Sequence, residues 1–211
     1  MSRSRRAIPA VLSAILASAT LLAAAAAPVA ARTPVDPSTL NPAPPDFFNA
    51  QCTQNGEHIL CTLHFVEDAV VDEPSGIVCG ETELLVSLTR SVTGKRTYSG
   101  AGDLLRRHFI ETFTGSLTNP SSGNVALWSQ HDTIIHDLAV PGDVDSGTIH
   151  NSGNFNRVWL PGGGTILTDA GTFLIDNATG EVLNQSTHHP FDAYFTGADP
   201  SALDAICDAL D

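Results

Sequence analysis

Short segments with alternating apolar and polar residues fill the middle of this 211-residue chain. Apolar residues occupy every second position across residues 58–66, and the same alternation returns across residues 83–90. A period of two is the pattern of a strand with one buried face. Turn-forming residues separate such segments at Thr93-Gly94, Ser99-Gly100, Pro141-Gly142 and in residues 119–123, 161–164 and 177–180. We therefore expect an all-β fold, an antiparallel meander of about eight strands closed as a small barrel, with an open sandwich as the alternative.

A helical pattern appears at the C-terminus. Asp199-Pro200 supplies an N-cap residue followed by proline at the first helical position. From Leu203 to Leu210, apolar residues recur at helical spacing on one face. We expect a short C-terminal helix that packs against the sheet.

Residues 1–31 have the order of a secretory signal peptide. Three arginines precede an Ala-rich apolar run, and the small residues 28–31 offer a cleavage site. The alternative is a membrane anchor, but Ala is weakly apolar and the cleavage site follows directly. We expect a secreted, extracellular protein in which the Pro-rich residues 32–50 form an extended or disordered lead-in and residues 51–211 form one domain.

The charge balance limits the classes of partner. The full chain has a net charge of −13, and removal of the leader leaves seven basic residues against 23 acidic ones, a net charge of −16. Nucleic acids and anionic membranes are bound by clustered basic residues. We therefore expect neither nucleic acid nor, after cleavage, a membrane as partner. The sequence leaves the oligomeric state open.

All four cysteines, Cys52, Cys61, Cys79 and Cys207, follow the leader. An even number of cysteines in an exported chain indicates two disulfides, with three connectivities. The tight-turn signal Asn55-Gly56 favours Cys52–Cys61, which leaves Cys79–Cys207 to tie the C-terminal segment to the body. A zinc site is the alternative, but the chain has no CxxC pair. We expect no metal and no cofactor.

The strand rhythm of residues 52–195 and the glycine-rich hairpin of residues 160–165 resemble the small closed barrels of the lipocalin and allene-oxide-cyclase/dirigent type. The resemblance implies a closed barrel. The lipocalin Gly-x-Trp signature is missing near the first strand, and the catalytic patterns of the cyclases and dirigent proteins are not recognisable. No catalytic residue is therefore assigned from these families.

Pairing across three expected hairpins sets titratable side chains opposite one another. A carboxylate beside an imidazole can orient a general base, and two imidazoles can begin a metal site. Such cross-strand pairs also commonly stabilise sheets, which is the stronger interpretation for each. The expected pairs are Glu111 with His131, His136 with His150, and Asp169 with His188.

Two further patterns suggest where a ligand would bind. Trp128 shares a strand face with Asp132 and His136, as in an amphiphilic barrel lumen, although a core face with polar ends is the stronger interpretation of the pattern. Residues 187–192 form the densest polar and aromatic cluster, near an expected barrel mouth, or else a packed loop. The expected ligand-binding residues are Trp128, His136, Asp169 and His188.

Two functions from different classes fit these patterns. The preferred one is a secreted binding protein for a small, largely apolar ligand, because nucleophile and metal motifs are scarce. The alternative is an extracellular enzyme that performs acid–base chemistry with His188 and Asp169 or with His131 and Glu111. A structural or partner-binding protein with a filled barrel is a third option. Whether the protein is an enzyme stays open.

Overall fold

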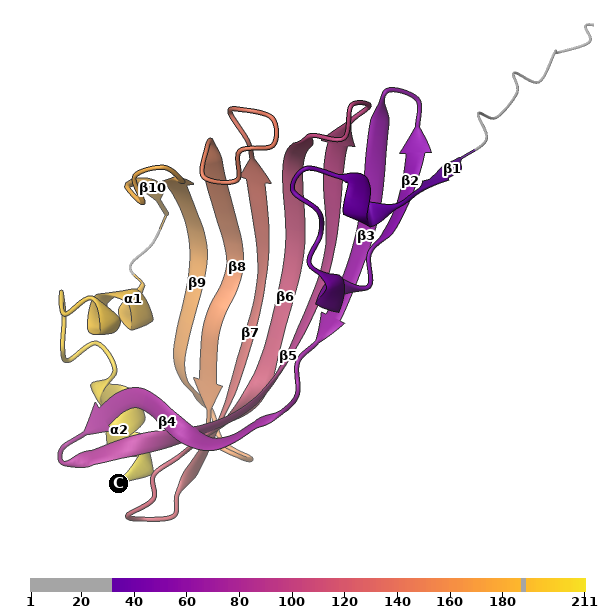
Figure 1. Cartoon of the computed structure of the whole chain (residues 1–211). Coiled ribbons are helices and arrows are strands. Elements are labelled where there is room, and N and C mark those ends of the chain that lie inside the picture. The colour runs from indigo at the N-terminus through magenta and orange to yellow at the C-terminus, as the bar shows by residue number, and fades with distance from the viewer. Residues whose placement is uncertain (1–31, 187–188) are drawn as a thin grey trace, which may run out of the picture.

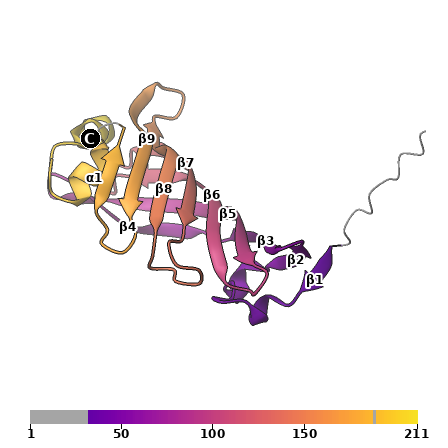
Figure 2. The same cartoon turned by 90° about the horizontal axis from the view of Figure 1, so that it is seen from above.

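The computed structural model describes residues 32–186 and 189–211. In this part of the chain, ten strands form one antiparallel sheet that curves strongly (Figures 1 and 2). The strands are β1 (Thr33–Val35), β2 (Gln51–Asn55), β3 (His58–Val66), β4 (Val70–Cys79), β5 (Thr82–Ser99), β6 (Leu104–Thr118), β7 (Val125–Asp137), β8 (Thr148–Trp159), β9 (Thr165–Asp176) and β10 (Val182–Gln185). The all-β class is confirmed, and the strand expected at residues 58–66 is β3.

The sheet is not closed, so the expected barrel is wrong. The strand order runs from β1 through β2, β3 and β5 to β10, and β4 joins β5 as a branch. β5 pairs with β4 through its first half and with β3 through its second half, from Ser91 to Ser99. The 18-residue β5 therefore carries two strands on the same edge, which diverge along its length. The end strands β1 and β10 do not pair with each other, and β10 is exposed throughout.

The length of β5 corrects a second expectation. Thr93-Gly94 is not a turn, because β5 continues through it to Ser99. A Cβ atom on Gly94 would lie 2.4 Å from Cδ1 of Phe109, its cross-strand partner on β6. Glycine at this position makes room for an aromatic ring inside the sheet, which the sequence pattern of a turn residue does not reveal.

Two helices, α1 (Pro190–Phe195) and α2 (Asp204–Leu210), follow the sheet, and in Figure 1 α2 lies at β4 while α1 lies above it. Helix α2 is the expected C-terminal helix, and it packs against β4, β7 and β9. It begins later than predicted. The Asp199 carboxylate accepts from the Ser201 backbone N–H at 3.0 Å, as an N-cap residue does, but it caps a turn over residues 200–203 that precedes the helix. Helix α1 was not predicted. We call the side of the sheet that faces these helices the concave face.

Both predicted disulfides are confirmed. Cys52–Cys61 joins β2 to β3, and Cys79–Cys207 joins the end of β4 to α2. Each disulfide belongs to a different hydrophobic core. The larger core lies under α2 and includes Leu84, Val158 and Ile206, none of which is exposed.

The second core lies under the N-terminal segment. This segment contains β1 and the short 3-10 helices η1 (Pro37–Thr39) and η2 (Asp46–Phe48). Leu40 is buried there with Tyr98, and the ring of Phe48 stacks on Phe109 at a centroid distance of 5.9 Å. The segment therefore covers the upper part of the concave face. No helix within the described residues combines the length and the apolar character needed to cross a bilayer.

Candidate functional site

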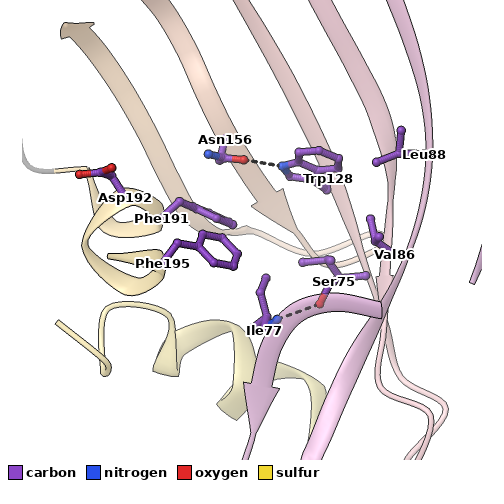
Figure 3. Close-up of a pocket in the computed structure, with 10 residues that line it drawn as sticks. Ser75, Ile77, Val86, Leu88, Trp128, Asn156, Phe191, Asp192 and Phe195 are labelled. Atoms are coloured by element: carbon purple, nitrogen blue, oxygen red, sulfur yellow. Dashed lines mark hydrogen bonds between the residues drawn. The ribbon is translucent and has the colours of Figure 1, made fainter. Parts of the chain in front are cut away.

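A cavity of about 400 Å³ opens on the concave face between the sheet, β4 and α1 (Figure 3). Its wall comes from the five strands β4 to β8 and from helix α1, and most of it is apolar. Ser75, Asn156 and Asp192 are the polar residues in its wall. The apolar residues of the wall are Ile77, Val86, Leu88, Leu117, Trp128, Phe191 and Phe195.

Trp128 is fixed in this wall by a polar contact. Its indole Nε1–H donates to Oδ1 of Asn156 at 2.8 Å, as Figure 3 shows. Its ring also lies 5.9 Å from that of Phe113 on β6. Because the indole N–H is satisfied inside the protein, the ring can present its carbon atoms to the cavity without leaving a buried donor unpaired.

Asp169 lies one strand beyond Asn156, as its register partner on β9. Oδ1 of Asp169 lies 2.7 Å from Nδ1 of His189, and both side chains are only 2% exposed. The His189 ring also packs against Phe155 and Phe173. This pair attaches the start of α1 to the sheet and so positions Phe191 in the cavity wall. His188, the predicted partner of Asp169, lies outside the described residues.

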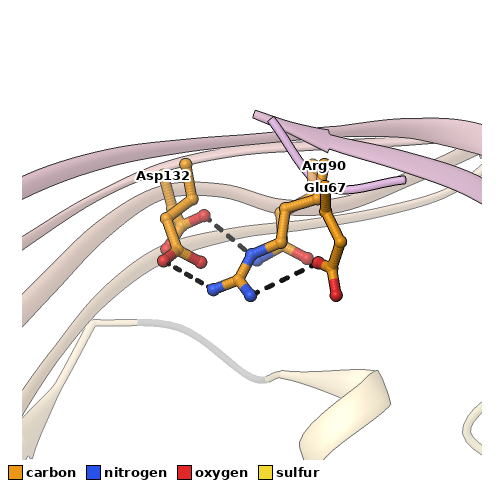
Figure 4. A network of polar contacts seen from close by, with 5 residues as sticks. Glu67, Arg90 and Asp132 are labelled. Carbon is orange, nitrogen blue, oxygen red and sulfur yellow. Dashed lines mark hydrogen bonds and ion pairs between the residues drawn. The ribbon is translucent and has the colours of Figure 1, made fainter. Parts of the chain in front are cut away.

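A network of charged and polar side chains lies next to the cavity on the concave face (Figure 4). Arg90 contacts Glu111 at 3.0 Å and Glu67 at 3.6 Å, and the amide of Gln130 donates to Asp132 at 3.0 Å. Arg90 on β5 and Gln130 on β7 both pair with Phe113 on β6. They lie two residues along their strands from the cavity residues Leu88 and Trp128. Burial raises the pKa of Asp132, which is 2% exposed, above its ordinary value.

The structure separates the expected pair of Glu111 and His131. Glu111 lies opposite Asp132, whereas His131 lies opposite Thr112 and contacts its hydroxyl at 3.0 Å. The register differs from the expected one by a single residue, which places Glu111 and His131 on opposite faces of the sheet.

The pairing of His136 with His150 is also wrong. His136 lies opposite Ile149, and His150 lies opposite Ile135. A β-bulge between Ser129 and His131 shifts the pairing of β7 with β8 by one residue, so the two imidazoles point to opposite faces. The described residues contain no group of three or more His, Cys, Asp or Glu side chains that could hold a metal.

His136 lies on the concave face but not in the cavity wall. It is 1% exposed, at the far end of β7, and its Nε2 lies 2.7 Å from the Ser146 carbonyl oxygen. Its Nδ1 contacts the guanidinium of Arg107. Burial, together with the nearby Arg107 charge, lowers the pKa of His136.

Of the four residues predicted to bind a ligand, the structure places Trp128 in the cavity wall and Asp169 next to the wall, as the register partner of Asn156. The sequence analysis did not identify Asn156 or the β4 residues Ser75 and Ile77 as wall residues. Asn156 follows a register shift in β8, and neither that shift nor the path of β4 produces a periodic pattern in the sequence. Phe191 belongs to the polar and aromatic cluster noted at residues 187–192, which was the available signal. Comparisons with protein-family models, curated proteins and solved structures found no match.

Proposed function

We propose that this chain is a secreted binding protein for a small, largely apolar ligand, which occupies the cavity between the sheet, β4 and α1. The observation that carries the proposal is the cavity of about 400 Å³, in which seven of ten wall residues are apolar. Small-molecule sites are typically concave and mostly apolar with a few polar groups, at volumes of about 300–1,000 Å³. A closed barrel is not needed, since β4 and α1 supply the missing walls. The two disulfides are compatible with an extracellular protein.

The geometry favours binding over acid–base catalysis. Glu111 and His131 lie on opposite faces and cannot act together. Asp169 and His189 are enclosed among aromatic rings and are not part of the cavity wall. Neither pair can therefore reach a molecule held in the cavity without a rearrangement.

Titration with n-octanol, followed by tryptophan fluorescence and calorimetry, tests the binding proposal. The chain has two tryptophans, so Trp159→Phe leaves Trp128 as the only reporter. We expect a saturable change in Trp128 emission, because Trp128 forms part of the wall. A strictly linear response would contradict the proposal.

A cavity-filling substitution localises the site. Val86→Phe adds bulk to the wall and should weaken n-octanol binding by about tenfold or more. The matched control is Val78→Phe, at a position on β4 that is 49% exposed and outside the cavity wall. Equal affinities of the two variants would place the ligand elsewhere.

Secretion is tested separately. Expression of the full chain with its own leader should deliver a protein to the medium whose N-terminal residue lies close to Arg32. Retention of the intact leader on the cell would overturn this part of the proposal.

A further inference from the structure

Two arginines lie side by side at the other end of the concave face, away from the cavity. Arg96 on β5 and Arg107 on β6 are register partners, and Arg107 is also the register partner of His136 on β7. Side chains that are directly opposite on one face have Cβ atoms only about 4.5–5.5 Å apart. Arg96 is 6% exposed, and Arg107 is half-buried.

Neither arginine has an acidic partner within the described part of the chain. The ion pairs that arginines form there involve Arg90 and Arg106. Arg96 donates from Nη1 to the Ala43 carbonyl oxygen at 3.5 Å, and its buried Nε has no acceptor. An unsatisfied donor on a buried cation is unfavourable and calls for an acceptor.

The neighbouring His136 accepts a hydrogen bond from Arg107 but does not neutralise its charge. Arg107 Nε donates to His136 Nδ1 at 3.1 Å, so the imidazole proton lies on Nε2, which donates to the Ser146 carbonyl oxygen. His136 is therefore neutral and acts as an acceptor for Arg107. Burial and the neighbouring Arg96 lower the pKa of Arg107, while the charge of Asp145 opposes this effect.

We propose that Arg96 and Arg107 form a binding site for an oxyanion group, a carboxylate, phosphate or sulfate. The planar guanidinium presents paired N–H donors that match the oxygens of such groups, and a bound anion would neutralise the two adjacent cations. An anion would reach the site from solvent on the side of the half-buried Arg107, because Arg96 is covered by Ala43 of the N-terminal segment. The site is separate from the cavity, so it does not depend on the proposed apolar ligand.

Thermal unfolding of the mature, disulfide-bonded protein tests the site. Sodium phosphate, sulfate and acetate are titrated at constant ionic strength made up with sodium chloride. We expect Tm to rise steeply at low oxyanion concentration and only logarithmically above Kd, by roughly 5–10 °C at about a hundredfold excess over Kd. A response to phosphate or sulfate alone identifies an inorganic-type oxyanion, and a response to acetate identifies a carboxylate. General salt stabilisation is linear and does not saturate, so a purely linear rise would overturn the proposal.

Two neighbouring arginines provide matched variants. Arg107→Gln should abolish this curved, logarithmic rise. Without added oxyanion the variant should unfold at a higher temperature than the parent, because one of two adjacent cations is gone. Arg106→Gln is the control, since Arg106 lies on the opposite face and pairs with Asp137 at 3.2 Å. Arg107→Lys keeps the positive charge but loses the paired N–H donors of the guanidinium, and this variant should bind the oxyanion more weakly than the parent. A logarithmic rise in Tm of parental size in Arg107→Gln would overturn the proposal.

Discussion

The two ends of the concave face are built differently. At the cavity end, walls come from β4 and α1, which are more than 100 residues apart in the sequence. At the arginine end, three successive strands supply Arg96, Arg107 and His136. The cavity therefore depends on long-range attachments, namely the Asp169–His189 pair and the Cys79–Cys207 disulfide, which spans 128 residues. The arginine row depends only on the register of a continuous meander. Substitutions that loosen α1 or β4 should thus affect one end and spare the other.

The largest effect is expected from Asp169→Ala. Removal of one partner of a buried pair typically costs about 3–5 kcal/mol of unfolding free energy. The variant also detaches the start of α1, so n-octanol binding should weaken while the oxyanion response at the arginine end persists. Urea denaturation and the two titrations measure these effects. Asp137→Ala, at an exposed ion pair, is the control and should cost less than about 1 kcal/mol. Equal losses in the two variants would contradict the anchoring role.

A smaller effect is expected when Cys79 and Cys207 are both changed to Ser. Loss of this disulfide should lower the unfolding free energy by about 2–4 kcal/mol, because the unfolded chain regains the freedom of a long loop. Ligand affinity in the cavity should fall, because Cys207 in α2 and the end of β4 separate. The matched double variant, with Cys52 and Cys61 both changed to Ser, opens a loop of sequence separation 9 in the other core and should leave n-octanol affinity unchanged. Unchanged cavity affinity in the Cys79/Cys207 variant would show that this disulfide does not hold the walls.

The smallest effect is expected in the pH dependence of stability. It concerns Asp132, which lies on β7 between the cavity end and the arginine end. Burial raises the pKa of Asp132 above its value of 3.8 in the unfolded chain. The native state therefore binds this proton more tightly, so its contribution to stability is complete below the unfolded pKa and is lost as pH rises through the raised value. We expect the unfolding free energy of Asp132→Asn, relative to the parent, to increase as pH rises through that range. Asp137→Asn serves as control; if both variants gave parallel pH profiles, the assignment to Asp132 would fail.

Much of the local structure follows from the sequence. Alternation over residues 58–66 predicts β3, because one buried face requires a period of two. The turn at Asn55-Gly56 brings Cys52 to Cys61 as register partners, so this disulfide is a local consequence of the hairpin. The apolar face of residues 203–210 similarly predicts α2, since a helix alone brings these positions together.

The sequence also places Trp128, Asp132 and His136 on one face of a strand, as the structure has them, because β7 pairs with β6 without any register shift from Val125 to Asp137. The extra residue of the bulge between β7 and β8 lies on β8. Their shared face is a property of one strand and needs no knowledge of its neighbours. What each residue meets on that face is not local, which is why Trp128 lines a cavity while His136 is held by Arg107 and Ser146.

Three features were decided by the tertiary structure alone. The sheet stays open with a branch at the long β5, whose two halves pair with different strands. No local sequence pattern specifies which strand each half of β5 pairs with. The cross-strand partners of the histidines depended on a single-residue register difference and on one bulge, each of which exchanges the faces of every later residue. The cavity required β4 and α1 to approach from distant parts of the chain. The sequence by itself therefore determined the all-β class, the strands with a clear alternation, the C-terminal helix and the disulfides, because these are set over a few residues, whereas the open sheet and its two binding regions arose from packing over the whole chain.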